Sequence, residues 1–308
     1  MSELTTPQLP ERPQRRGVLI GLIAFLVVAV MAVVAVVWTT GDDDPQARTV
    51  RIGTTEAGAP YWATYRELAA AEGITLDVVS FSDYTQANPA LSQGQLDLNL
   101  FQHLLFLANY NVANSDTLTP IASTYVVPLS LYSRKHGTVE AIPDGGTVAI
   151  PNDPTNQARA LLVLQQAGLI TLTGGGSVLS TPAEIVAEES KVTVTPVDAA
   201  QTVASLSSVD AAVVNNNFAL NGGLDPSTAL FGDDPASPTA EPYINAIVAR
   251  ADTKDDPVLR RVAELYRDPR VTSLVEAESK GTSVAVERPA DELAGILGTL
   301  SDTIRAAG

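Results

Sequence analysis

The sequence of 308 residues contains no cysteine. Disulfide bonds, thiol nucleophiles, thiolate metal sites and a lipid-modified cysteine are therefore all excluded. Hydrophobic residues make up 45% of the chain, which is enough for a substantial core. Stability must therefore come from the packing of apolar side chains.

Basic side chains and imidazoles are also scarce. Lysine and arginine number 19 against 35 acidic residues, and the net charge of -16 would repel nucleic acid and anionic lipid. The only imidazoles are His103 and His136, and the chain has no Gly-x-Ser-x-Gly, His-Glu-x-x-His or phosphate-loop motif. We therefore expect neither an enzyme nor a cofactor or metal. A membrane-tethered hydrolase that uses a carboxylate pair is the rival class, because acidic residues are abundant.

One long apolar run stands near the N-terminus. It extends from Val18 to Trp38, about 21 residues or roughly 31 Å as a helix, which is enough to cross a bilayer. Arginines precede the run and aspartates follow it, so the positive-inside rule places the rest of the chain outside the cell. We expect a cytoplasmic tail over 1–17, a single-pass membrane anchor over 18–38 and a linker over 39–48.

A cleaved signal peptide is the alternative interpretation of this run. The apolar core of a signal peptide is about 7–15 residues long and is followed by small residues before the cleavage site. Here the run is longer and ends in Val37-Trp38-Thr39-Thr40. The length favours a retained anchor, and a mature N-terminus near Gly41 would indicate cleavage instead.

Beyond the linker, segments typical of strands alternate with segments typical of helices. This alternation predicts α/β units with a largely parallel sheet. The first unit has strands over 49–54, 76–81 and 96–101, with helices over 61–72 and 104–110. The second has strands over 147–151, 192–197 and 211–215, with helices over 155–167 and 199–206.

Two extended apolar segments, 124–135 and 243–250, bracket the second unit and are expected to cross between two lobes. The first lobe would cover 49–125 and the second 126–249. A tail over 250–308, helical at 257–266 and 290–307, would return to the first lobe. Two such lobes form a cleft, and ligands of open α/β sheets bind beyond the carboxyl ends of the strands.

The segment from Ile150 to Arg159 is the most informative strand end. Asp153 or Thr155 can cap the following helix, and Pro154 suits a helix start. The helix N-terminus then faces the cleft and attracts an anion, and Arg159 near the first turn suits a carboxylate ligand. The alternative is a surface arginine paired with Asp153, and this segment alone does not choose between the two.

Other strand ends carry amides and aromatic rings. Asn215 and Asn216 follow one strand and can supply neutral donors and acceptors, although asparagine also favours turns. Tyr84, Phe101 and His103 follow neighbouring strands and can enclose an apolar ligand group, although such rings more often belong to the core.

Several of these segments together resemble the methionine-binding lipoproteins of ABC importers, the NlpA or MetQ type. The resemblance runs from about Thr49 to Arg270, and its most specific part is Pro-Asn-Asp-Pro-Thr-Asn at 151–156. The other matching segments, in the same order, are Phe81-Ser82-Asp83-Tyr84, Leu100-Phe101-Gln102-His103, Val214-Asn215-Asn216 and Pro242-Tyr243-Ile244-Asn245.

The resemblance implies a two-lobed periplasmic-binding-protein fold of type II, here preceded by the transmembrane helix. Such a protein binds a free amino acid outside the cell, methionine in this family, and delivers it to a permease driven by an ATPase. By the resemblance, Arg159 with Asn156 holds the α-carboxylate, and Asn215 or Asn216 with Asn245 holds the other backbone polar groups. Tyr84, Phe101 and His103 would surround the thioether, which packs well on aromatic faces.

The sequence departs from the family pattern in three places. The lipidated cysteine is absent, and the transmembrane helix is expected to replace it. The stretch from Glu56 to Trp62 and the pair Leu104-Leu105 differ, and the helical tail beyond Val286 is longer. The first-lobe wall of the pocket is therefore open to variation. Another apolar amino acid, a methionine derivative or a short methionine peptide are the alternative ligands.

Overall fold

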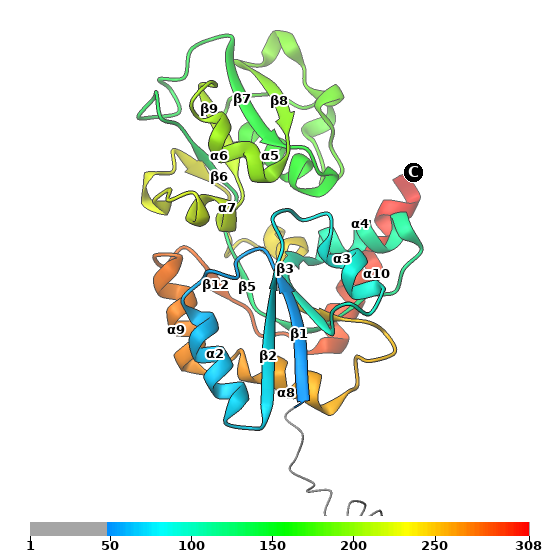
Figure 1. Ribbon diagram of the computed structural model, residues 1–308. Coiled ribbons are helices and arrows are strands. Elements are labelled where there is room, and N and C mark those ends of the chain that lie inside the picture. The colour runs from blue at the N-terminus through cyan, green and yellow to red at the C-terminus, as the bar shows by residue number, and fades with distance from the viewer. Residues whose placement is uncertain (1–47, 308) are drawn as a thin grey trace, which may run out of the picture. The chain divides into compact units, whose positions relative to one another are not determined.

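The computed structural model describes residues 48–307. The predicted tail over 1–17, the anchor over 18–38 and the linker up to residue 47 lie outside the described residues. None of the helices within 48–307 is long and apolar enough to cross a membrane. The described chain forms two lobes, each built around a five-stranded sheet (Figure 1).

The first lobe contains a mixed sheet with strand order β2-β1-β3-β11-β4. β1 pairs in parallel with β2 and β3, whereas β11 runs antiparallel to both β3 and β4. Its elements are β1 (Arg48–Thr54), α2 (Tyr61–Ala70), β2 (Ile74–Ser80), α3 (Ala87–Ser92), β3 (Leu98–His103), α4 (Leu104–Asn114), β4 (Thr119–Ser123), β11 (Asn245–Ala249), α8 (Pro257–Leu265), α9 (Pro269–Glu278) and α10 (Ala290–Ala307). A small pair, β5 (Tyr125–Val126) with β12 (Val284–Ala285), lies beside it.

Helices cover both faces of the first sheet (Figure 1). Successive side chains of a strand point to opposite faces of the sheet. In the central strand β11 the side chains on both faces are apolar, so both faces must be covered. Ile247 and Ala249 pack with α2, α8 and α9, whereas Ala246 and Val248 pack with α4 and α10. The helical tail is therefore an integral part of the first lobe.

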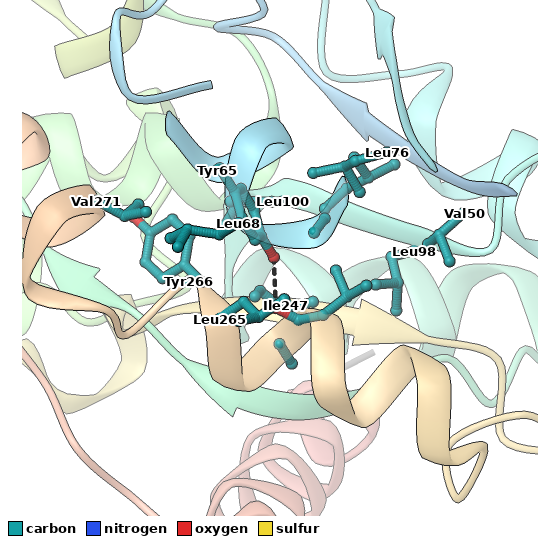
Figure 2. Packing of buried hydrophobic residues seen from close by; sticks show 14 of the residues in the cluster. Val50, Tyr65, Leu68, Leu76, Leu98, Leu100, Ile247, Leu265, Tyr266 and Val271 are labelled. Carbon is teal, nitrogen blue, oxygen red and sulfur yellow. Dashed lines mark hydrogen bonds between the residues drawn. The ribbon is translucent and has the colours of Figure 1, made fainter. Parts of the chain in front are cut away.

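Tyr65 of α2 ties one of these helix layers together (Figure 2). Its ring lies in the cluster with Leu100 and Ile247 of the sheet, and its hydroxyl donates a hydrogen bond of 2.7 Å to the carbonyl of Val262 in α8. Buried tyrosine hydroxyls usually form such a hydrogen bond, because an unpaired buried hydroxyl lowers stability. The apolar contacts and this hydrogen bond together fix α2 against α8.

The second lobe has strand order β10-β6-β9-β7-β8. β7 is parallel to β8 and β9, and β6 is antiparallel to β9. Its elements are β6 (Ser130–Tyr132), β7 (Gly146–Pro151), α5 (Pro154–Gln166), β8 (Val192–Val197), α6 (Thr202–Ser205), β9 (Ala211–Val214), α7 (Asn216–Asn221) and β10 (Phe231–Gly232). Within residues 48–307 there are also six 3-10 helices: η1 (Thr173–Gly175), η2 (Pro182–Glu184), η3 (Ala187–Glu189), η4 (Ala199–Gln201), η5 (Pro226–Thr228) and η6 (Pro238–Tyr243).

The predicted alternation of strands and helices is present, but the crossings between the lobes need correction. The segment 124–135 holds two short strands, β5 and β6, so the first crossing is confined to the residues between them. The segment 243–250 was expected to be a crossing and to close the second lobe at 249. Instead β11 is a central strand of the first sheet, so the chain returns before Asn245. An apolar run that is buried on both faces is typical of a central strand.

We expect Ile247→Ala to lower the free energy of unfolding by about 2–5 kcal/mol, because it leaves a cavity between the sheet and its helices. Val284→Ala is the matched control, since Val284 is exposed and the change should cost less than about 0.5 kcal/mol. Urea unfolding measures both. Equal losses for the two variants would show that β11 is not a central core strand.

Candidate ligand-binding site

A cavity lies where the carboxyl ends of strands from both sheets meet. Its volume is about 550 Å3 when the opening to solvent is included. All eight site residues predicted from the sequence line it: Tyr84, Phe101, His103, Asn156, Arg159, Asn215, Asn216 and Asn245. The fold therefore brings together residues that are spread over most of the described chain.

Seven further lining residues were not predicted. Three of them could have been predicted from the sequence. Asn217 continues the run of asparagines at 215–216, and Thr55 and Glu56 directly follow strand β1, as other predicted site residues follow their strands. The complete set of additional residues is Thr55, Glu56, Gln102, Phe106, Tyr125, Val127 and Asn217. Tyr125 and Val127 could not be predicted in this way, because they lie in the segment 124–135, which the sequence indicated as a crossing and not as a strand end.

Arg159 of α5 is buried, with only 4% of its side chain exposed. Its Nε and Nη2 donate to the two carboxylate oxygens of Asp233 at 2.6 and 3.0 Å, and Nη2 also donates to the carbonyl of Val127 at 2.8 Å. The guanidinium lies 4.1 Å from the centre of the Tyr243 ring. Nη1 forms no hydrogen bond with any described residue, so it is available to a ligand.

The alternative of a surface arginine paired with Asp153 is wrong. Asp153 instead caps helix α5, where it accepts a hydrogen bond of 3.0 Å from the backbone N–H of Asn156. Pro154 occupies the first turn, as its missing N–H predicts. The true partner, Asp233, lies on the second crossing, which the sequence pattern did not connect to α5.

A chain of amides begins at the same cap. Asn156 Nδ2 donates to both oxygens of Asp153, at 3.0 and 3.1 Å, and Asn156 Oδ1 accepts from Asn215 Nδ2 at 2.8 Å. Asn215 Oδ1 is inaccessible to solvent and has no hydrogen-bond partner, and it is the one fully buried polar side-chain atom of the described lining residues without one. Asn216 also lines the cavity but is only half-buried. Of the two asparagines, Asn215 therefore offers the acceptor that most needs a ligand donor.

His103 is held in one neutral form. Its Nδ1 accepts a hydrogen bond of 3.1 Å from the backbone N–H of Phe106 and so caps helix α4. Burial, and next the charge of Arg159, lower the pKa of His103 to about 3. Because Nδ1 accepts, the proton is assigned to Nε2, which lies 3.4 Å from Asn156 Oδ1. His103 can therefore act as a hydrogen-bond donor but not as a base at neutral pH.

An aromatic wall lies on the first-lobe side of the cavity. The rings of Tyr84 and Phe101 are 5.9 Å apart between centres, and that of Phe106 lies 5.9 and 5.8 Å from them, respectively. Phe218 of the second lobe packs on Tyr84 at 4.9 Å. Such edge and tilted contacts form a firm apolar surface.

Glu56 stands between β1 and α2, in the stretch over 56–62 for which we expect variation within the family. Its Oε1 accepts hydrogen bonds from the hydroxyls of Tyr61 at 2.7 Å and Tyr125 at 3.2 Å. Burial raises the pKa of Glu56 to about 7, against the effect of these hydrogen bonds. At neutral pH the carboxyl group of Glu56 is therefore protonated in a fraction of the molecules and ionised in the others.

Hydrogen bonds join the lobes at the rim of the cavity. Asn217 Nδ2 donates to Thr55 Oγ1 at 3.1 Å, and Asn221 Nδ2 donates to the Thr55 carbonyl at 3.2 Å. The Tyr84 hydroxyl donates to Asn217 Oδ1. Further out, Lys280 pairs with Asp225 at 2.5 Å. These contacts hold the lobes together over the cavity.

The charges and surfaces suit binding rather than catalysis. Among the described lining residues, only Glu56 and Arg159 have side chains that can be charged at neutral pH, since His103 is neutral. Within residues 48–307 no group of three histidine or acidic side chains is placed to hold a metal ion. The cavity can thus receive a small molecule with an anionic group, hydrogen-bond donors and an apolar part.

Comparison with known proteins agrees with this geometry. The family described as NlpA lipoprotein matches residues 50–286. This protein belongs to the NlpA lipoprotein family. The resemblance seen in the sequence motifs is thereby confirmed. The family consists of non-catalytic substrate-binding proteins, which confirms the expectation that the protein is no enzyme.

Curated and solved relatives point the same way. The "D-methionine-binding lipoprotein MetQ" of Salmonella typhi is 32% identical over 249 residues, which cover 79% of this chain and 90% of the relative. The substrate-binding protein of a methionine transporter from Streptococcus pneumoniae is 39% identical, with a TM-score of 0.72 over 77% of this chain and 95% of that one. A nutrient-binding protein from Burkholderia cenocepacia, solved bound to methionine, is 35% identical, with a TM-score of 0.70 over 77% and 99%. The two-lobed α/β periplasmic-binding-protein fold is therefore shared.

We expect Asp233→Ala to lower the free energy of unfolding by about 3–5 kcal/mol, because it leaves the buried Arg159 charge without its partner. Asp234→Ala is the matched control, since Asp234 is exposed and makes only a local turn contact, worth no more than about 1 kcal/mol. Urea unfolding at neutral pH compares them. A similar, small effect of both changes would mean that Asp233 is not needed to balance Arg159.

Proposed function

We propose that this protein is the substrate-binding component of an ABC importer and captures free methionine in the cavity between its lobes. The observation that carries the proposal is the pairing of a buried arginine and an unpartnered buried amide oxygen with an aromatic wall. Arg159 and Asn215 supply the first two, and Tyr84 with Phe101 supplies the third. These are the groups that an apolar α-amino acid requires.

The proposed contacts follow the donors and acceptors left free around the cavity. Arg159 donates from Nη1 to the α-carboxylate, since its other nitrogens are already bound to Asp233 and Val127. Asn215 accepts from the ligand amino group through Oδ1, with Asn245 beside it. The contributions of such charged hydrogen bonds are about 1.5–3 kcal/mol each.

The remaining proposed site residues shape the rest of the pocket. The side-chain amide of Asn156 already forms hydrogen bonds with Asp153, Asn215 and His103. Its proposed role is therefore to orient Asn215 and His103 and not to bind the ligand directly. Tyr84, Phe101 and His103 surround the thioether, which is polarizable and packs well against rings. Asn216 remains a second candidate for the backbone polar groups.

We expect Asn215→Ala to weaken methionine binding by at least about 10-fold, because it removes the unpartnered acceptor and loosens Asn156. Asn114→Ala is the matched control, since Asn114 is exposed and outside the cavity. Calorimetry with L- and D-methionine, leucine, methionine sulfoxide and a methionine dipeptide tests ligand and site together. Stoichiometric binding of another member of this panel in preference to methionine would change the ligand and leave the binding function intact.

The transport partners and the membrane anchor form the second part of the proposal. The family implies delivery of the ligand to a permease driven by an ATPase, on the extracytoplasmic side of the membrane. The type II form of the fold is supported by β11, which returns from the second lobe between β3 and β4. With no cysteine to lipidate, the run from Val18 to Trp38 would hold the protein at the membrane and raise its concentration near the permease.

We expect the full chain to stay in the membrane fraction after an alkaline carbonate wash, and a variant lacking residues 1–44 to be soluble, because the apolar run spans the bilayer. N-terminal sequencing of the membrane-bound protein checks for cleavage. A mature N-terminus near Gly41 would identify a cleaved signal peptide and contradict the anchor.

A further inference from the structure

Glu56 is held firmly in the wall of the cavity. Its backbone N–H donates to Thr54 Oγ1 at 3.2 Å, and its carbonyl accepts from Trp62 Nε1 at 3.0 Å. Its Oε1 receives the hydroxyls of Tyr61 and Tyr125. The side chain is thus positioned by several elements, in the way that a binding residue must be positioned.

The same carboxyl group has no positive partner among the described residues. No lysine, arginine or histidine of 48–307 forms an ion pair with Glu56, and Oε2 has no hydrogen-bond donor there. Arg159, the other charged lining residue, is already paired with Asp233. Glu56 is half-buried, and a carboxylate that is partly removed from water without a cation is destabilised, which a positively charged ligand group would offset.

The residues around Glu56 indicate which group of a ligand would supply the missing positive charge. Thr55, next to Glu56, is hydrogen-bonded by Asn217 and Asn221 from the amide segment that also carries Asn215. Glu56 and Asn215 both line the cavity, and each has one side-chain oxygen without a hydrogen-bond donor among the described residues. An ammonium group has three N–H donors and one positive charge, and it can satisfy both.

We propose that Glu56 accepts the ammonium group of the bound amino acid and so selects ligands with a free, charged amino group. This inference rests on the proposed function, since it assigns one more residue to the same ligand. It also gives the cavity a charge pattern that matches a zwitterion: Arg159 for the carboxylate and Glu56 for the ammonium. Deaminated or N-acylated analogues, which keep the carboxylate but lack the ammonium charge, would leave Glu56 without its partner.

Ligand binding should then depend on pH. The titratable groups that face Glu56 are Tyr61, Tyr84, Tyr125, Tyr266 and Glu278. Burial raises the pKa values of these tyrosines above their usual range, so they stay neutral, and it also raises the pKa of Glu278. The pKa of Glu56 is about 7 without ligand, and an ammonium group lowers it, so binding releases a proton below pH 7 and affinity falls as the pH falls.

The test is a cycle that combines Glu56→Gln with removal of the ligand amino group. The ligands are L-methionine and 4-(methylthio)butanoate, which keeps the carboxylate and the thioether. At pH 8 we expect Glu56→Gln to weaken methionine binding about 10- to 100-fold and to change binding of the deaminated analogue less than about threefold. Glu278→Gln is the matched control, since Glu278 neighbours Glu56 but does not line the cavity, and it should leave both ligands unaffected.

A second measurement needs no variant. Calorimetry of the parent protein at pH 6.5 in buffers of different ionisation enthalpy counts protons, and we expect methionine to release a fraction of a proton and the deaminated analogue to release none. Equal binding of methionine by the parent and Glu56→Gln would overturn the role of Glu56 while methionine binding stands. A parent protein that binds no methionine would instead contradict the proposed function itself.

Discussion

The buried ion pair between Arg159 and Asp233 organises the centre of this molecule. Removing a guanidinium from water costs several kcal/mol, and only a well-aligned carboxylate offsets that cost. Asp233 also accepts the backbone N–H of Leu129 at 2.8 Å, and Arg159 donates to the Val127 carbonyl. The pair thus joins α5 to both segments that cross between the lobes. One guanidinium nitrogen is left free, so the interaction that stabilises the crossings also orients the donor for a ligand.

A second polar network builds on the cap of α5. Asp153 fixes Asn156, and Asn156 in turn receives Asn215 from the second sheet and His103 from the first. Because His103 is neutral and caps α4, the network reaches across the cavity without adding a charge. Its buried unpartnered atom, Asn215 Oδ1, belongs to a residue that lines the cavity.

The first-lobe wall of the cavity is built around Glu56. Tyr61 and Tyr125 donate hydrogen bonds to its carboxyl, and Trp62 donates one to its backbone carbonyl. Tyr61 and Trp62 belong to the buried cluster that packs on the first sheet, and close packing of this kind restricts the movement of the groups attached to it. The core of the first lobe thus helps to position the carboxyl group.

Much of the fold and of the candidate site depends on interactions between residues that are close in the sequence, so it could be predicted from the sequence. Strand and helix periodicity, the Asp153-Pro154 cap and the positions that follow each strand depend on neighbouring residues, and they predicted the α/β class and six of the lining residues. The family resemblance added Asn156 and Asn245. The partner of Arg159 lies 74 residues away, and β11 joins the first sheet after the chain has built the second lobe. Such pairings depend on the path of the whole chain and on which buried charge must be neutralised. Only the tertiary structure decided them, together with the choice of Asn215 as the unpartnered acceptor and the place of Glu56 in the wall.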